Sequence, residues 1–201
     1  MGQICRNRIQ IQLDAFALVL LAAGLLILPL PWIGAAFLAG AVHELSHWAA
    51  VCLCGGRICR LRVGVRGAVM DAPPMTEGKK LLCALAGPIG GLCLLLIGRH
   101  MPRTALCAAI QSTYNLLPVC PLDGGRALES LASRLFPQRI AHSICRFAAA
   151  ATCVFILLLG AYTTFVWRVG ILGLLIAITA VARIRGNSRK TPCKVGQFTI
   201  Q

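Results

Sequence analysis

The chain has 201 residues, of which 58% are hydrophobic and only 13% are charged. Ordinary soluble domains contain about 45–50% apolar residues, glycine included, and about 25% charged residues. This composition excludes a disordered chain, a fibrous repeat and almost any water-soluble globule, and it indicates a polytopic membrane protein. The formal net charge of +14 then points to basic loops at the anionic face of a lipid bilayer and not to nucleic-acid binding.

Six apolar segments follow one another along the chain and are candidate membrane spans. They cover residues 13–28, 32–54, 81–98, 104–119, 147–167 and 169–182. The last segment is short for a bilayer core of about 30 Å. Six spans place both termini on one side, and that side then carries 17 of the 20 basic residues. The positive-inside rule therefore predicts a multi-pass protein of the cell membrane with cytoplasmic N- and C-termini.

Three further segments are predicted to form strands or a helix at the membrane interface. Apolar and polar residues alternate in Ile9–Leu13 and in Arg60–Arg66, which is typical of half-buried strands. Residues Gly125–Phe136 have leucines at helical spacing before Pro137, which indicates an amphipathic helix at the cytoplasmic interface. We expect an all-α polytopic membrane protein with about six transmembrane helices and a small membrane-interface β-sheet.

The expected organisation has three parts. Residues 1–136 contain the N-terminal strand, four spans, the interface strands and the amphipathic helix. Residues 137–182 add two further spans, and residues 183–201 form a short basic cytoplasmic tail.

The second apolar segment contains His43-Glu44-Leu45-Ser46-His47. Residues four apart share one face of a helix, so His43 and His47 can bind one metal ion while Glu44 reaches a water molecule on it. Two imidazoles and a carboxylate inside a membrane span are costly unless they face a polar cavity or bind something. The motif therefore predicts a zinc site with Glu44 as general base.

Catalytic zinc needs a third protein ligand, and the metzincin spacing is not met because Ala50 and Leu53 stand where Gly and His would be. We expect Asp123, because it ends an apolar span that Pro118 and Pro121 break. We expect it in preference to the other carboxylates and thiols that could bind zinc: Asp14, Asp71, Glu77, Glu129 and Cys120.

Two amides lie on one face of the fourth span, four residues apart. A buried Asn115 can hold a substrate backbone or polarise its carbonyl, whereas Gln111 is expected to bond another helix. The small residues of Ala86–Gly91 are expected to let the third span press against the metal-bearing helices. His100 and His142 are expected to be structural.

The motifs HELSH (43–47), AGPIGG (86–91) and NLLPVCPLDGG (115–125) together resemble the site-2 protease family of intramembrane zinc metalloproteases. The short N-terminal strand, the six spans and the cytoplasmic termini look most like the bacterial stage IV sporulation protein FB group. The resemblance implies one zinc ion on His43, His47 and Asp123, catalysis by Glu44, and substrate contact by Asn115. It also implies a sheet at residues 57–66 that receives unwound substrate.

Two features depart from that group. A cytoplasmic CBS domain commonly follows the last span of its members, and none follows here, so regulation by a nucleotide through that domain is not expected. Ser46 and Gly91 stand where Gly and Asn are frequent in relatives. Neither change removes a ligand, but both weaken any assignment to one substrate.

The expected activity is therefore that of a zinc metalloendopeptidase that cuts membrane-spanning or membrane-associated proteins, with a sporulation pro-sigma factor or an anti-sigma factor among the candidate substrates. Zinc would lower the pKa of its bound water and polarise the peptide carbonyl, and Glu44 would move the proton. Strand addition to the edge of residues 60–66 is the expected way to hold an unwound substrate. A metal-ion transporter and a catalytically silent scaffold stay open as alternative functions, and the sequence leaves open whether an inhibitory membrane partner exists.

Overall fold

The structure is a computed structural model that describes residues 10–13, 24–26, 28–56, 58, 60–64, 67–72, 75–165, 178 and 198–200. The long helices of this part are α2 (Leu30–Leu53), α3 (Glu77–Cys93), α4 (Pro102–Asn115), α5 (Asp123–Leu135) and α6 (Gln138–Phe165), and a short 3-10 helix, η1 (Leu94–Ile97), continues α3. Prolines stand at three of the boundaries, because proline fits the first turn of a helix but not its interior. Pro31 and Pro102 open α2 and α4, and Pro137 separates α5 from α6.

Within the described residues, three helices are long and apolar enough to cross a membrane: Leu30–Leu53, Glu77–Ile97 and Gln138–Phe165. They lie at the second, third and fifth predicted spans. The first and last predicted spans fall mostly outside the described residues. The fourth is α4, whose 14 residues measure about 21 Å at 1.5 Å per residue, less than the bilayer core.

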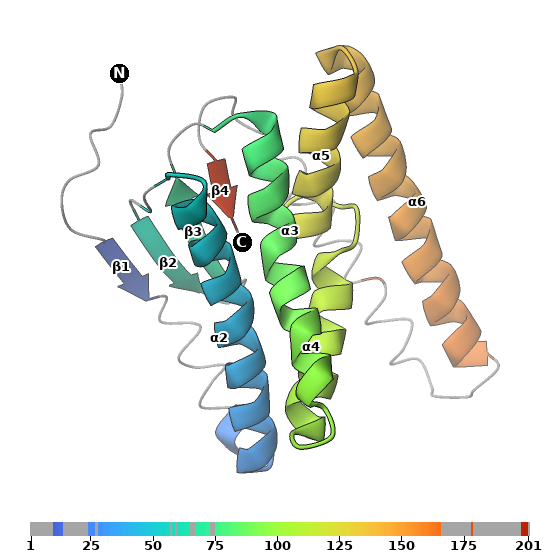
Figure 1. Cartoon of the computed structure of the whole chain (residues 1–201). Helices are drawn as coiled ribbons and strands as arrows, with labels where there is room; N and C mark the ends of the chain where they lie inside the picture. The colour runs from blue at the N-terminus through green and yellow to red at the C-terminus, as the bar shows by residue number, and fades with distance from the viewer. Residues whose placement is uncertain are drawn as a thin grey trace.

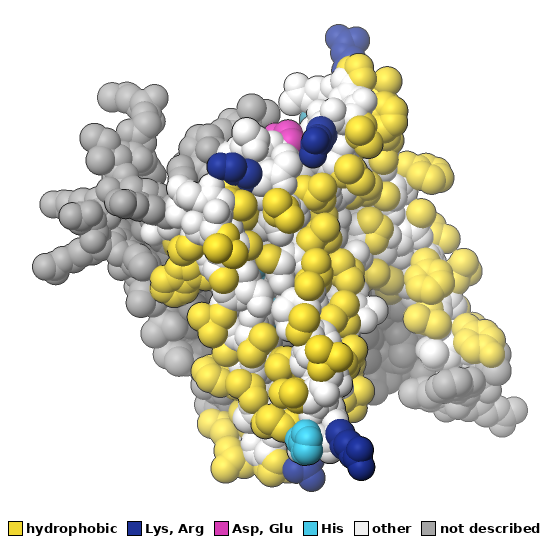
Figure 2. Space-filling model, in the orientation of Figure 1, with side chains coloured by type: hydrophobic (Ala, Val, Ile, Leu, Met, Phe, Trp, Pro, Cys, Tyr) yellow, Lys and Arg dark blue, Asp and Glu magenta, His cyan; other side chains and the backbone are white. Residues whose placement is uncertain are grey.

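The surface of the bundle is apolar where a membrane would surround it. Large hydrophobic side chains such as Phe37, Leu96, Phe147 and Phe155 are exposed. Figure 2 shows hydrophobic side chains over the middle of one face, with Lys and Arg at its two ends. A soluble monomer rarely exposes so large an apolar surface, so this distribution indicates a lipid-facing protein.

Helix α3 lies at the centre of the bundle and contacts α2, α4 and α5, whereas α6 packs on α5 (Figure 1). Small residues make these contacts. The buried positions of α5 include Gly124, Gly125, Ala127 and Ala132, while Leu131 and Leu135 are exposed and Leu128 is half-buried. The predicted amphipathic helix therefore exists, but it packs mainly through its small residues, and two of its three leucines are exposed.

The strands form one four-stranded sheet in the described part of the chain, in the order β1-β2-β3-β4. Their bounds are β1 Gln10–Leu13, β2 Arg60–Gly64, β3 Gly67–Ala72 and β4 Phe198–Ile200. β1 pairs with β2 in parallel, and the other pairs are antiparallel. The sheet therefore joins residues near both ends of the chain, beside the upper half of the helices in Figure 1.

Strands β1 and β2 lie where the alternation of residues predicts them, but one expectation about them is wrong. We expected residues 60–66 to offer a free edge for an incoming strand. β2 is an inner strand, because β1 takes one of its edges and β3 takes the other. An added strand can pair only with the outer edge of the sheet.

Candidate metal centre

Two histidines of α2 face the interior of the bundle, one helical turn apart. His43 and His47 are 1% and 0% exposed, and their rings meet edge to face with centroids 4.8 Å apart. The i, i+4 spacing brings both rings to the same side of the helix. They lie about 9–15 Å, by helix rise, from the end of α2 at Leu53, so the pair is well inside the apolar bundle and not at its rim.

Asp123 reaches the histidines from a loop that follows α4. The helix ends at Asn115, and Pro118 and Pro121 keep the following residues out of helical structure. α5 then begins at Asp123. Gly124 and Gly125 lie directly against the backbone of residues 116–120, where any Cβ atom would collide. The two glycines thus let the loop fold back closely enough to place Asp123 beside α2.

Three side-chain atoms converge at this point. The Nε2 atoms of His43 and His47 each lie 3.1 Å from Oδ2 of Asp123, and they are 3.2 Å apart. Zinc with bonds of about 2.0–2.1 Å to such ligands in tetrahedral geometry separates ligand atoms by about 3.3 Å. The group is therefore spaced as a metal site requires, and these three buried residues could hold a metal ion.

The tautomer of His47 supports metal binding. Its Nδ1 lies 2.7 Å from the carbonyl oxygen of Cys83 in α3. A carbonyl only accepts hydrogen bonds, so Nδ1 donates its proton to it, which leaves Nε2 as the nitrogen that can bind a metal. Nδ1 of His43 has no hydrogen-bond partner in the described part of the chain.

The charge balance at this point also favours a cation. Asp123 is 0% exposed, and its Oδ1 has no hydrogen-bond partner among the described residues. A buried carboxylate is costly unless a positive charge accompanies it. A divalent metal between the three ligand atoms would supply that charge, so the residues present fit the metal that the motif predicts.

Glu44 and Asn115 flank the three ligand atoms. Glu44 follows His43 on α2, is half-buried, and interacts electrostatically with His47. The amide nitrogen of Asn115, at the end of α4, lies 3.1 Å from Nε2 of His43. Helices α2 and α4 and the loop before α5 therefore bring a carboxylate and an amide to the same place.

Glycines of α3 let that helix approach the histidines. A Cβ on Gly87 would overlap the His47 ring, one on Gly90 would overlap the Ser46 hydroxyl, and one on Gly91 would overlap Oγ of Ser112. This close approach is also what brings the Cys83 carbonyl to His47. The Cys83 contact escapes sequence reasoning because a backbone acceptor carries no side-chain signature.

The other candidate residues lie elsewhere. Glu77 pairs with Lys80 at 2.7 Å, and Cys120 Sγ lies 3.8 Å from Glu129 Oε2. Gln111 points toward Gly40 of α2, as a helix–helix contact would. His100 and His142 are exposed. Asp14 and the side chain of Asp71 fall outside the described part of the structure.

The fold is similar to that of a solved structure, the site-2 protease from Methanocaldococcus jannaschii. The TM-score is 0.60 at 20% sequence identity, and the match covers 97% of this chain and 97% of that one. No protein-family model matches the chain, and no curated protein matches it. The likeness therefore extends over the whole fold.

Proposed function

We propose that this chain is an intramembrane zinc metalloprotease that cuts membrane-spanning or membrane-associated proteins. One observation carries the proposal: His43, His47 and Asp123 meet inside an apolar bundle with the spacing of a zinc site, and a carboxylate lies next to them. The likeness to a site-2 protease fold agrees with it. The rival classes do not need this arrangement, because ion passage or scaffolding requires no carboxylate beside two helical histidines.

The roles follow from the chemistry of each group. One zinc ion, bound by His43, His47 and Asp123, would polarise the scissile carbonyl and acidify an attacking water molecule. Glu44 accepts the proton of that water and returns it to the leaving nitrogen. Asn115 holds the substrate backbone next to His43. The Cys83 carbonyl and Gly87 keep the His47 ring in place.

The same proposal covers the location of the protein. We infer a multi-pass protein of the cell membrane with both termini in the cytoplasm. The basic residues support this, and so does the sheet, because β1 and β4 come from opposite ends of the chain and lie in one sheet. A sporulation pro-sigma factor or an anti-sigma factor as substrate, an inhibitory membrane partner and membership of the sporulation group stay predictions.

The proposal is tested by cleavage of a single-span substrate by the wild type and by Glu44→Gln. Glutamine keeps the shape of glutamate but accepts no proton, and general-base catalysis contributes about 10²–10⁴-fold. We expect cleavage to fall by that factor while zinc content stays at the wild-type level, because all three ligands are unchanged. Glu129→Gln is the matched control and should cleave normally. Undiminished cleavage by Glu44→Gln would remove the proposed mechanism.

A further inference from the structure

The two outer strands of the sheet have different surroundings. β1 forms the side of the sheet that lies farthest from α3, whereas β4 lies between β3 and α3 (Figure 1) and contacts α3. Helix α3 is the one whose Cys83 carbonyl bonds to His47. Of the two outer strands, β4 is therefore the one next to the helix that contacts His47.

Strand β4 pairs with β3 along its C-terminal half. In the antiparallel register Phe198 is opposite Ala72, Thr199 is opposite Asp71, and Ile200 is opposite Met70. Phe, Thr and Ile favour extended structure. Backbone hydrogen bonding of this kind accepts many sequences, because the backbone groups of an edge strand are the same for every incoming chain.

The proposed function requires hydrogen-bond partners for an extended substrate. A helix keeps its carbonyls in hydrogen bonds, so a membrane helix has to unwind and extend before a peptide bond can be attacked. In the hydrocarbon region the freed backbone groups need partners, and an outer strand of a sheet provides them. β2 has no free edge, and β1 lies on the far side of the sheet, which leaves the edge of β3.

We infer that residues 198–200 compete in cis with substrate for the edge of β3, so that this part of the tail restrains the enzyme. The inference rests on the proposed function. A tethered strand at an effective concentration of about 1 mM weakens the apparent affinity of a competitor about tenfold when its own dissociation constant is about 0.1 mM. The restraint is therefore of modest size, and a substrate held at several points overcomes it.

The test compares the full chain with a variant that lacks residues 198–201, both carrying Glu44→Gln so that nothing is cleaved. The probe is a dye-labelled peptide with the sequence of residues 194–201, KVGQFTIQ. We expect it to bind the shortened protein about tenfold more tightly than the full chain. Amide hydrogen exchange in Gly67–Ala72 should speed up on truncation and slow again with the peptide. Gln201→Ala, next to β4, is the control and should behave as the full chain.

The truncation in an otherwise wild-type chain then tests the link to cleavage. We expect a KM about tenfold lower for a single-span substrate and an unchanged kcat, with added peptide as competitive inhibitor. Equal peptide binding by both proteins, unchanged exchange in β3, or an unchanged KM would each overturn the inference. If neither protein cleaves any substrate, the proposed function fails, while peptide binding and exchange still decide whether β4 occupies the edge of β3. Zinc content shows that the shortened chain is folded.

Discussion

His47 is positioned by contacts on two sides of its ring. The Cys83 carbonyl accepts the Nδ1 proton, and Asp123 lies at Nε2. The ring therefore cannot rotate without losing one of the two, and both partners are buried. Such an arrangement would fix a ligand before a metal binds, which would reduce the entropy lost on binding.

Asp123→Asn should remove the metal. The substitution keeps the size of the side chain but replaces an anionic oxygen with a neutral amide. Changes in residues that only orient a ligand already cost about 10–100-fold in metal affinity, so we expect the loss of the charged ligand to cost at least about 100-fold. Zinc content of the purified protein measures this. Glu129→Gln, a carboxylate of the same helix, should keep its zinc, and full zinc occupancy in Asp123→Asn would refute the ligand assignment.

Asn115→Ala should reduce cleavage without affecting zinc. Its amide nitrogen lies 3.1 Å from His43 Nε2, so it can donate to a carbonyl oxygen held at the metal. Removing one donor of this kind typically lowers kcat by about 10²–10³-fold. We expect a loss of that order in cleavage of a single-span substrate, with normal zinc content. The control is Gln111→Ala, one turn earlier on α4, for which we expect only a small effect on cleavage. Loss of zinc from Asn115→Ala would instead show that Asn115 has a structural role.

At this scale the side chains of the site follow from local rules. The i, i+4 spacing of His43 and His47 places them on one face, and the broken helix before Asp123 makes that carboxylate stand out. The Cys83 carbonyl does not follow from such rules. Its role depends on how closely α3 packs against α2. That distance is set by both helices together and cannot be inferred from either segment alone.

The close packing of α3 rests on glycines that face three different partners. Gly87 meets the His47 ring, Gly90 meets Ser46, and Gly91 meets Ser112. Small residues let helices approach closely in a membrane, where the hydrophobic effect does not drive helix association. In this chain they also bring the backbone of α3 to the metal centre.

Gly87→Ala should damage both packing and metal binding. The added Cβ would collide with the His47 ring around Nε2, the ligand atom. Overpacking typically costs about 1–3 kcal/mol, and we expect a lower melting temperature in detergent together with weaker zinc binding. Gly34→Ala is the control, because no atom lies within 4 Å of its Cβ position and alanine favours a helix by about 0.5–1 kcal/mol. Normal zinc affinity in Gly87→Ala would mean that α3 does not position His47.

The elements differ in how far sequence predicts them. Helices α2 and α3 and strands β1 and β2 lie where hydrophobic periodicity indicates, because that signal is local. β4 has only three residues, which is too short for a periodic pattern to indicate a strand. Its place in the sheet depends on pairing with a strand far away in the sequence. The expectation of a free edge on β2 is wrong for a related reason: β3 is not predicted as a strand, and the pairing of β1 with β2 joins residues about fifty positions apart.

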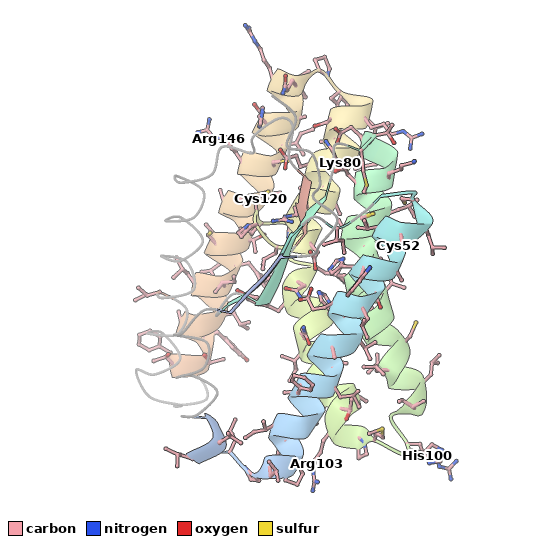
Figure 3. All side chains as sticks on the ribbon, turned by 90° about the vertical axis from the view of Figure 1, so that its left-hand side faces the viewer. Cys52, Lys80, His100, Arg103, Cys120 and Arg146 are labelled. Atoms are coloured by element: carbon pink, nitrogen blue, oxygen red, sulfur yellow. The ribbon has the colours of Figure 1, made fainter. Side chains whose placement is uncertain are left out.

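For the whole molecule, the distribution of charge and aromatic residues defines two ends of the bundle. Figure 3 shows His100 and Arg103 at the lower end and Lys80 and Arg146 toward the upper end. Arg103 lies 6.0 Å from the centre of the Trp32 ring, and a tryptophan beside a basic residue is typical of a membrane–water interface. The sheet lies toward the upper end, with β1 and β4 from the two ends of the chain.

Reporter fusions should therefore place Gln201 in the cytoplasm and the turn at Arg99 outside. The reason is twofold: most basic residues fall on the side of the termini, and a single sheet that contains both β1 and β4 requires an even number of crossings between them. Fusions of a reporter that is active only in the cytoplasm, made at Gln201 and at Arg99, measure this. A cytoplasmic signal at both sites would contradict the odd number of crossings that the six-span arrangement places between Arg99 and Gln201, and a cytoplasmic signal at Arg99 alone would reverse the orientation. The metal centre would then open to the opposite side, and a cytoplasmic route for water and substrate would be lost.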